Sequence, residues 1–277
     1  MPELPEVETI RRGLAACLVG ARITSVKVLR ASVVVGPVAR FANQLRGREF
    51  VGFRRHGKLL IIDLSGGVSL LVHLRMTGQL LLPVGHERPE HTRVVFHVQG
   101  RKEASSLFSS LLVYADCRAL GTLEVARNAT LARMGPDALS PEGPEHLGAS
   151  LSGRRAPIKC VLLDQSVMAG IGNIYASEIL HAARIAPDRP ANTLSPAERR
   201  RLRVQTRRIL QAAVAAGGTT LLDGRYCDPV GTPGGYRKRL RVYGRAGERC
   251  LRRGCGGTVE RLVQHNRSTF WCRGCQE

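Results

Sequence analysis

The sequence predicts an α+β protein of two domains, and three observations support this fold class. Short segments rich in β-branched and aromatic residues recur between residues 22 and 127, as in an antiparallel sheet. Helical periodicity replaces them from residue 158 onward. Four cysteines then crowd the end of the chain, where they predict a small β-hairpin held by a metal ion.

A helix is predicted at the start of the chain. Apolar residues recur at helical spacing from Val7 to Leu18, and Pro5 with the acids Glu6 and Glu8 is typical of a first turn. This helix is amphipathic and its first residues are acidic, so the chain does not begin like a secretory signal.

Pro2 and Glu3 precede this helix. Removal of Met1 would leave a proline secondary amine beside a carboxylic acid, which is a nucleophile next to a general acid/base. On these residues alone, an ordinary frayed terminus that enters a helix is the simpler interpretation.

Six predicted strands follow, and Gly-containing breaks separate most of them. They cover residues 22–29, 58–64, 68–74, 93–98, 107–114 and 121–125. Their lengths and spacing favour an antiparallel sandwich or barrel. The Pro/Gly-rich stretch 134–156 is interpreted as a linker.

The second half is predicted to be helical over residues 158–164, 174–183 and 196–216. Ser195 and Glu198 form a capping-box pattern around Pro196, and Gly217-Gly218 supplies a stop. Arginines occupy several faces of the long helix. A solvated basic face explains them more simply than direct contact with a polyanion.

The charge of the chain indicates a polyanionic partner. The 277 residues include 42 Lys+Arg against 22 Asp+Glu, a formal net charge of +20. No apolar run long enough to span a membrane accompanies this excess. Nucleic acid is therefore favoured over a membrane, and a cytoplasmic location is expected.

Two glycines bracket a turn between predicted helices. Gly170 and Gly172 allow close approach of the backbone to a ligand, and the amides that follow Asn173 suit a phosphate. A packing turn between two helices is the default alternative.

The cysteine cluster predicts a zinc site. Cys250 and Cys255 are separated by four residues, and Cys272 and Cys275 by two. Four thiolates can close a tetrahedral zinc site and hold together a hairpin too small for its own core.

Taken in order, these motifs resemble the formamidopyrimidine-DNA glycosylase family, which in its wider sense includes endonuclease VIII. The resemblance covers essentially the whole chain. It rests on the opening PELPEVET, the Lys58 strand, His73-Leu-Arg-Met-Thr-Gly, the Gly170–Asn173 turn, Val242-Tyr-Gly-Arg and the terminal cysteines.

The resemblance implies a catalytic role for four residues. Pro2 would attack C1′ of the damaged nucleotide, expel the base and form an imine, and Glu3 would exchange protons with the sugar. Lys58 would act near the lesion phosphate during β-elimination. Arg267, in the hairpin tip, would grip phosphate and assist δ-elimination. The resemblance implies no redox cofactor and no catalytic metal.

A base that is extruded from a duplex leaves a gap, which side chains must fill. The resemblance assigns this to Met76, Arg118 and Leu120, with Arg118 facing the orphaned base. Core positions for Met76 and Leu120, and a structural pairing of Arg118 with Asp116, are the alternatives.

Five further residues match positions that contact phosphate or DNA: His73, His91, Arg155, Asn173 and Tyr243. For each histidine, a satisfied structural hydrogen bond is the alternative. The segment 217–236, with Thr219, Thr220 and Tyr236, resembles a loop that closes over an everted 8-oxoguanine. Simple disorder is the alternative for so long a Gly-rich loop.

The chain departs from the family pattern at three places. Four residues instead of two separate Cys250 from Cys255, and Leu120 stands where the family usually has phenylalanine. Arg225-Tyr-Cys and Arg237-Lys-Arg in the loop region also differ from common family residues. Lesion choice is therefore less firmly implied than reaction type.

The resemblance thus implies a bifunctional DNA glycosylase/AP lyase of base excision repair that removes oxidised purines from duplex DNA. The alternatives are an endonuclease VIII-like enzyme for oxidised pyrimidines and a zinc-dependent protein that binds damaged DNA without cutting it. One structural Zn²⁺ and a monomer associated with the bacterial nucleoid are expected. The implied domains are a β-sandwich (1–133), the linker (134–156), a helix-two-turn-helix domain with the loop (157–240) and a zinc-finger hairpin (241–277).

Overall fold

The computed structural model describes residues 2–83, 85, 88–100, 110–127 and 134–277, and the chain divides into two compact units. Unit 1 comprises Met1–Leu131 and Ala216–Gly235. Unit 2 comprises Ala132–Ala215 and Tyr236–Glu277.

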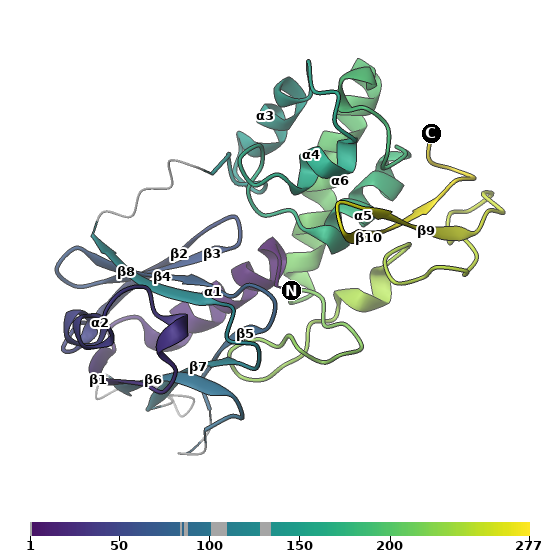
Figure 1. Ribbon diagram of the computed structural model, residues 1–277. Helices are drawn as coiled ribbons and strands as arrows, with labels where there is room; N and C mark the ends of the chain where they lie inside the picture. The colour runs from purple at the N-terminus through teal and green to yellow at the C-terminus, as the bar shows by residue number, and fades with distance from the viewer. Residues whose placement is uncertain (1, 84, 86–87, 101–109, 128–133) are drawn as a thin grey trace. The chain divides into compact units, whose positions relative to one another are not determined.

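Unit 1 is built from two antiparallel sheets and a leading helix (Figure 1). Its helices are α1 (Leu4–Leu18), the short η1 (Ala31–Val33) and α2 (Val38–Leu45). Its strands are β1 (Arg22–Val28), β2 (Phe50–His56), β3 (Leu59–Leu64), β4 (Val68–His73), β5 (Gly78–Leu81), β6 (Thr92–Gln99), β7 (Leu111–Asp116) and β8 (Thr122–Arg127). The strand orders are β1-β6-β7-β5 and β2-β3-β4-β8.

One apolar core joins the two sheets of unit 1. Phe96 and Leu112 of one sheet, Ile62 and Val72 of the other, and Leu14 of α1 belong to a single buried cluster. Two sheets that share a core form a sandwich, so the structure decides between the sandwich and barrel alternatives. The predicted apolar face of α1 is confirmed.

The predicted strands agree with the structure to within a few residues, except that residues 107–109 lie outside the described part of the chain. Sequence analysis missed β2, β5 and α2. Gly52, Arg54 and Arg55 interrupt the apolar alternation of β2, β5 has only four residues, and α2 only eight. Each is too short or too polar to give a clear periodic signal.

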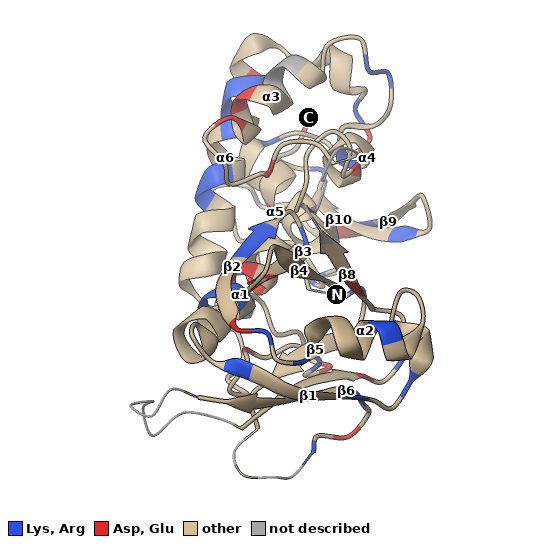
Figure 2. Ribbon diagram, turned by 90° about the vertical axis from the view of Figure 1, so that its left-hand side faces the viewer, with Lys and Arg blue, Asp and Glu red and all other residues tan. Residues whose placement is uncertain are grey.

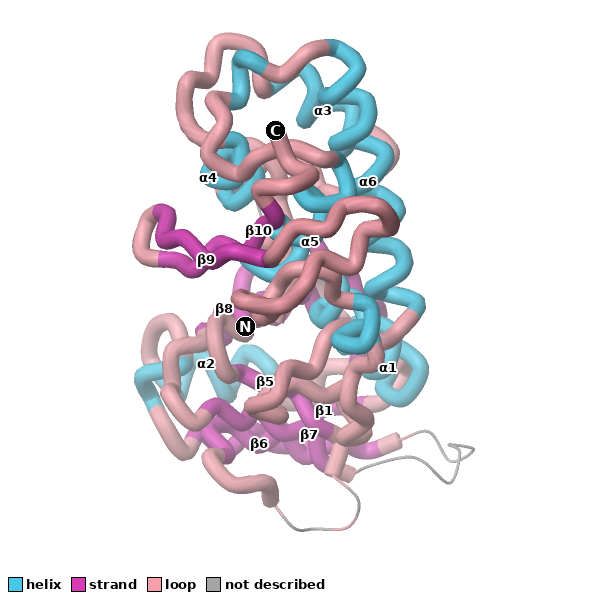
Figure 3. Tube along the Cα trace, turned by 90° about the vertical axis from the view of Figure 1, so that its right-hand side faces the viewer, coloured by secondary structure: helices cyan, strands magenta, loops and turns pink. Residues whose placement is uncertain are grey.

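Unit 2 is mainly helical and ends in a hairpin. It contains α3 (Gly143–Ser150), α4 (Ile158–Leu163), α5 (Asn173–Ala183), η2 (Ala191–Thr193), α6 (Pro196–Ala215), η3 (Tyr236–Arg239), β9 (Val259–Gln264) and β10 (Arg267–Cys272). Strand β10 packs beside α5 (Figure 3). The capping box of α6 is confirmed, because Ser195 N donates to Glu198 Oε2 at 2.8 Å and Glu198 N to Ser195 Oγ at 3.3 Å.

Several arginines of α6 make structural contacts. Arg199 donates to Ser152 Oγ at 2.8 Å, Arg201 donates to the Ala183 carbonyl at 3.2 Å, and Arg203 pairs with Glu145. Figure 2 shows how Lys and Arg positions recur along this helix. These contacts give three of its arginines partners within the protein, a role that neither a solvated basic face nor direct contact with a polyanion predicted.

Two boundary predictions differ from the structure. The stretch 134–156, interpreted as a linker, contains α3, whose Leu147 is buried against the rest of unit 2. Proline and glycine at the ends of this stretch hid a helix of eight residues. Residues 216–235, assigned by sequence to the helical domain, group with unit 1. Within the described residues, no helix has the length and apolar character needed to cross a membrane.

Candidate active site

The start of α1 fixes Pro2 and Glu3 in place. Glu3 is the N-cap residue of the helix, in an extended conformation, and forms a capping box with Glu6. Glu3 N donates to Glu6 Oε2 at 2.8 Å. Pro2 and Glu3 are both buried. The predicted helix start is confirmed, while Met1 lies outside the described residues.

Glu6 also attaches the glycine-rich loop to the start of α1. Its Oε1 accepts a hydrogen bond from Thr219 N at 2.7 Å. Gly218 has a φ of +82°, and a Cβ there would lie 3.0 Å from the same oxygen, so the close approach requires glycine. The sequence indicated Glu6 only as an acid of the first helical turn, not as the residue that binds this loop.

Further hydrogen bonds organise this loop, residues 216–235. Thr220 Oγ1 donates to the Tyr226 carbonyl at 2.7 Å and accepts from Gly234 N at 2.7 Å. Gln79 of β5 donates to the Arg225 carbonyl at 2.8 Å. Leu222, at 84% exposure, extends into solvent. The loop therefore has a defined conformation, which disorder would not give.

Tyr236, predicted as a loop residue, lies in unit 2. It opens η3 and packs its ring 5.9 Å from that of Tyr175 in α5. Tyr236 follows directly after the loop in sequence, but its ring packs within unit 2.

Lys58 lies in a two-residue turn between β2 and β3. His56 pairs with Leu59 across this turn, and Gly57 has a φ of +58°. The Lys58 side chain is 6% exposed. Since Leu59 pairs with His73 of β4, the turn places Lys58 beside the end of that strand.

His73 stays neutral at physiological pH. Burial lowers the pKa of His73, the charges of Arg75 and Lys58 act in the same direction, and together they place the pKa at about 4. Its Nδ1 accepts a hydrogen bond from Arg75 N at 3.1 Å, so the ring proton is on Nε2. His73 can therefore donate one neutral hydrogen bond to a phosphate.

A charge cluster around Glu8 adjoins the Lys58 turn through Arg55, and the sequence did not predict it. Glu8 of α1 accepts hydrogen bonds from Arg11, Arg12 and Arg55. Burial raises the pKa of Glu8, but these arginines more than offset it and hold the pKa at about 2. The i, i+3 and i, i+4 spacing of Glu8, Arg11 and Arg12 could have indicated the ion pairs within α1 from the sequence.

The predicted gap-filling side chains lie on the surface. Met76 is 42% exposed, Leu120 is 46% exposed, and Arg118 is exposed as well. The core alternative for Met76 and Leu120 is therefore wrong. Asp116 accepts from the backbone N of Arg118 at 3.1 Å, and no ion pair joins the two side chains among the described residues.

His91 is exposed and adopts a φ of +58°. Its carbonyl accepts a hydrogen bond from Asp116 N at 3.0 Å. This places His91 next to the end of β7, in the same unit as the other predicted residues of the first domain.

In unit 2, the glycine-bracketed turn leads into α5. Gln165 Oε1 accepts from Gly170 N at 2.9 Å, and Gly172 is the N-cap of the helix that begins at Asn173. Asn173 Nδ2 donates to the Ser268 carbonyl at 2.9 Å, and its Oδ1 is buried without a partner. The amide is thus held at the start of the helix with one polar atom still unsatisfied.

Arg267 lies at the tip of the β9–β10 hairpin. His265 and Asn266 form its turn, both with positive φ, and Arg267 is exposed. Its side chain lines a cavity of about 350 Å³ together with Arg154 and His265. The predicted Arg155 is exposed beside this cavity but does not line it.

A buried lysine holds the hairpin against α4. Lys159 is 0% exposed, and its Nζ donates to the Ser268 carbonyl at 3.2 Å and to Thr269 Oγ1 at 2.6 Å. Sequence analysis missed this residue, because a lysine in a short helix is normally exposed.

Tyr243 is anchored through its backbone. Glu178 of α5 accepts from the backbone N of Arg241, Val242 and Tyr243, each at 2.9 Å. Burial raises the pKa of Glu178 despite these hydrogen bonds. The Tyr243 ring contacts Phe270 edge-on, with the centroids 5.0 Å apart.

The four predicted cysteines come together as expected. The Sγ atoms of Cys250, Cys255, Cys272 and Cys275 all lie within 4.8 Å of one another. Cys250 and Cys275 are 3.9 Å apart, and Cys255 and Cys272 3.6 Å. Tetrahedral Zn–S bonds of about 2.3 Å require edges of about 3.8 Å between sulfurs. The donor set therefore fits zinc.

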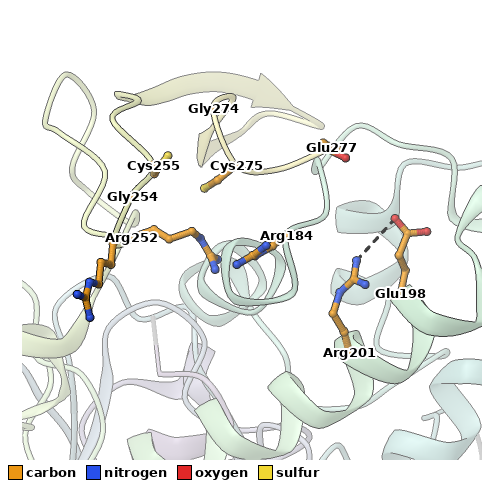
Figure 4. Close-up of a pocket in the computed structure, with 10 residues that line it drawn as sticks. Arg184, Glu198, Arg201, Arg252, Gly254, Cys255, Gly274, Cys275 and Glu277 are labelled. Atoms are coloured by element: carbon orange, nitrogen blue, oxygen red, sulfur yellow. Dashed lines mark ion pairs between the residues drawn. The ribbon is translucent and has the colours of Figure 1, made fainter.

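The longer segment between Cys250 and Cys255 contributes charge to this site. Arg184 and Arg252 point toward each other beside Cys255 and Cys275 (Figure 4). Arg252 N donates to Cys250 Sγ at 3.5 Å. Four thiolates around a Zn²⁺ ion would have a net charge of −2, which these arginines would offset.

The chain is similar to known proteins over its whole length. Two family models match: the formamidopyrimidine-DNA glycosylase N-terminal domain over residues 1–123 and the formamidopyrimidine-DNA glycosylase H2TH domain over residues 134–223. The formamidopyrimidine-DNA glycosylase of Methylobacterium sp. is 40% identical over 304 aligned residues, covering 100% of this chain and 99% of the relative. That of Cereibacter sphaeroides is 41% identical over the full length of both chains.

Solved structures agree over the whole chain. The MutM (Fpg) protein of Thermus thermophilus superposes with a TM-score of 0.87 at 39% identity, covering 99% of this chain and 98% of that one. Lactococcus lactis Fpg in complex with DNA that contains an abasic site gives a TM-score of 0.89 at 30% identity, with both chains fully covered. The predicted fold class and resemblance are confirmed: the chain belongs to the formamidopyrimidine-DNA glycosylase family.

Proposed function

We propose that the protein is a bifunctional DNA glycosylase/AP lyase that removes oxidised purines in base excision repair. One observation carries this proposal. Unit 1 holds the buried Pro2-Glu3 pair at the start of α1, the buried Lys58 turn and two exposed loops with Met76 and Leu120, and the family match extends over the same residues.

The proposed chemistry begins with the Pro2 amine once Met1 is removed. The amine attacks C1′ of the damaged nucleotide, and the bond from C1′ to the base breaks. The C1′–O4′ bond of the sugar then opens, O4′ takes up a proton, and a cationic imine forms between Pro2 and C1′. Glu3 exchanges protons with the sugar, since it is the carboxylate next to the amine. The imine then acidifies the neighbouring C–H bond, and loss of that proton expels the 3′ phosphate in β-elimination.

Lys58 and Arg267 are proposed to act on the phosphates. Lys58 is buried in its turn and supplies a cation near the lesion phosphate. Arg267 is exposed at the hairpin tip and assists the second elimination. His73, His91, Arg155, Asn173 and Tyr243 are proposed to bind the DNA backbone, a role that the neutral Nε2–H of His73 suits.

We also propose that the cysteine cluster binds one structural Zn²⁺. Zinc would be held by Cys250, Cys255, Cys272 and Cys275, and would fix the hairpin that carries Arg267. The proposal includes no other metal and no redox cofactor.

The substrates of the enzyme could be oxidised purines or oxidised pyrimidines. Structural relatives include a Lactococcus lactis Fpg variant in complex with Fapy-dG DNA and the wild-type protein in complex with DNA that contains an oxidised pyrimidine. We propose oxidised purines as the main substrates, with Thr219, Thr220 and Tyr236 at or next to the lesion loop. The endonuclease VIII-like preference for oxidised pyrimidines is the second candidate.

Single-turnover excision rates on duplexes with 8-oxoguanine or thymine glycol test this choice, with Glu3→Gln as the impaired control. Faster release of 8-oxoguanine supports the proposal, and faster release of thymine glycol overturns it.

We propose that the enzyme acts as a monomer in the cytoplasm, associated with the nucleoid.

A further inference from the structure

The loops that carry Met76 and Leu120 are adjacent because of the strand order. Residues 74–77 connect β4 in one sheet to β5 in the other, and residues 117–121 connect β7 back to β8. His73 pairs with Thr122, and Gly78 pairs with Asp116. The two crossover loops therefore run side by side between two pairs of hydrogen-bonded strands.

One buried carboxylate receives hydrogen bonds from both loops. Asp116 is 1% exposed. Its Oδ1 accepts from Thr77 Oγ1 at 2.5 Å and from Arg118 N at 3.1 Å. Its Oδ2 accepts from Gly121 N at 2.9 Å and from Tyr114 OH at 3.0 Å. Burial raises the pKa of Asp116, but these donors lower it by more, so the group is ionised at neutral pH.

Both exposed side chains follow a residue in a strained conformation. Arg75, before Met76, has a φ of +52°, and Ala119, before Leu120, has a φ of +50°. Residues other than glycine keep such angles only where the surrounding structure over-determines them. The hydrogen bonds that Asp116 accepts from Arg118 N and Gly121 N supply that constraint on the 117–121 loop, and the Thr77 hydroxyl extends it to the 74–77 loop.

We propose that Asp116 is a positioning residue which, through the Thr77 hydroxyl, locks the Met76 and Leu120 loops into one arrangement, so that both side chains enter the gap left by an extruded nucleotide together. This inference rests on the proposed function. Neither Asp116 nor Thr77 contacts the reacting atoms in this account.

The structure offers a matched pair of variants. Thr77→Val removes the hydroxyl that joins the two loops and preserves the shape of the side chain. Tyr114→Phe also removes one hydroxyl from the same carboxylate, but Tyr114 belongs to β7 and leaves the connection between the loops intact. Thr77→Ser keeps the connecting hydroxyl and serves as the rescue variant.

Two assays separate positioning from general damage. Single-turnover excision of 8-oxoguanine from duplex DNA requires the gap to be filled. Borohydride trapping on a single-stranded abasic oligonucleotide requires the imine chemistry but leaves no gap in a duplex. Thermal unfolding of each variant reports the loss of stability.

We expect Thr77→Val to lower duplex excision by roughly tenfold, the scale of a small misplacement of groups that must act together. Trapping on the single strand should stay within about twofold of wild type, as should both activities of Tyr114→Phe and Thr77→Ser. If Thr77→Val does not fold, Thr77→Ala is measured in its place.

Equal losses of duplex excision in Thr77→Val and Tyr114→Phe would overturn the inference, since the carboxylate would then matter only for stability. Equal losses on duplex and single strand in Thr77→Val would overturn it too. Failure of the proposed function would give a different result. The wild-type protein would then neither excise 8-oxoguanine from the duplex nor be trapped on the single-stranded abasic oligonucleotide.

Discussion

The guanidinium of Arg55 and the carboxylate of Glu8 form a buried ion pair, with Nε 3.2 Å from Oε2. The Nη1 of the same guanidinium donates to the Gly57 carbonyl at 2.9 Å. Arg55 therefore fastens the turn that carries Lys58 to the helix that begins next to Glu3. The proposed nucleophile and the proposed phosphate-binding lysine are held by one chain of contacts within unit 1.

Glu8→Gln should weaken this connection and lower the free energy of unfolding at pH 7 by about 1–3 kcal/mol. The pKa of Glu8 is lowered from 4.5 to about 2, so its stabilisation is complete above pH ~4.5 and is lost as the pH falls through about 2. Denaturant unfolding of both proteins from pH 7 to pH 3 should show the difference between them shrinking. A difference that is constant over this range would contradict the assignment.

Asp63→Asn is the matched control for Glu8→Gln. Arg54, next to Arg55 on β2, pairs with Asp63 at 2.6 Å, but the two side chains are 59% and 26% exposed. Exposed pairs contribute about 0–1 kcal/mol. The Asp63 variant should therefore unfold close to wild type and retain its lyase activity, whereas Glu8→Gln should lose lyase activity as Lys58 shifts.

Lys159→Met should loosen the hairpin tip. The Ser268 carbonyl and the buried Thr269 hydroxyl would both lose a charged donor, and a hydrogen bond to a charged group contributes about 1.5–3 kcal/mol. Hydrogen exchange of residues 265–269 should accelerate, while exchange in unit 1 should not change. Unchanged exchange at the tip would show that Asn173 alone holds the hairpin.

Removal of zinc should unfold the β9–β10 hairpin and abolish DNA binding, while far-UV circular dichroism of the sandwich strands persists. Cys275→Ser should lose stoichiometric zinc, measured by plasma mass spectrometry. Cys160→Ser, at an isolated and half-buried thiol, should keep it. Wild-type protein without one zinc per chain would refute the metal site.

Leu120→Phe should change how the enzyme responds to the base opposite the lesion. An aromatic ring would add stacking of about 1–3 kcal/mol per base, which the exposed leucine does not supply. Excision of 8-oxoguanine opposite C, A and T should be compared with wild type. The same ranking and rates in both proteins would rule out a role for Leu120 in this preference.

Sequence alone predicted the parts of the fold that have a strong periodic signal. Local sequence patterns indicated four of these parts: the amphipathic α1, most strands of the sandwich, the capped α6 and the four clustered cysteines. The α3 helix gives no such signal, because it has only eight residues, which include a proline and two glycines, and so has too few turns for a periodic pattern.

Family motifs in the sequence predict site residues, whereas contacts formed by the completed fold create roles that no motif marks. Asp116 and Lys159 are polar residues whose roles depend on partners distant in sequence, Thr77 and Ser268. Burial of such groups is decided by the completed fold, so no local pattern distinguishes them from surface residues. The order of the motifs, in contrast, was enough to indicate Pro2 and Glu3.

The most direct measurement is borohydride trapping on duplex DNA that contains 8-oxoguanine opposite cytosine, with the N-terminus of the protein verified by intact mass. The account predicts a covalent adduct that peptide mapping places on Pro2. The adduct should be reduced in Glu3→Gln and in Pro2→Gly, which replaces the secondary amine by a primary one. A zinc-loaded protein without Met1 that forms no adduct on this lesion, on thymine glycol or on an abasic site would contradict it.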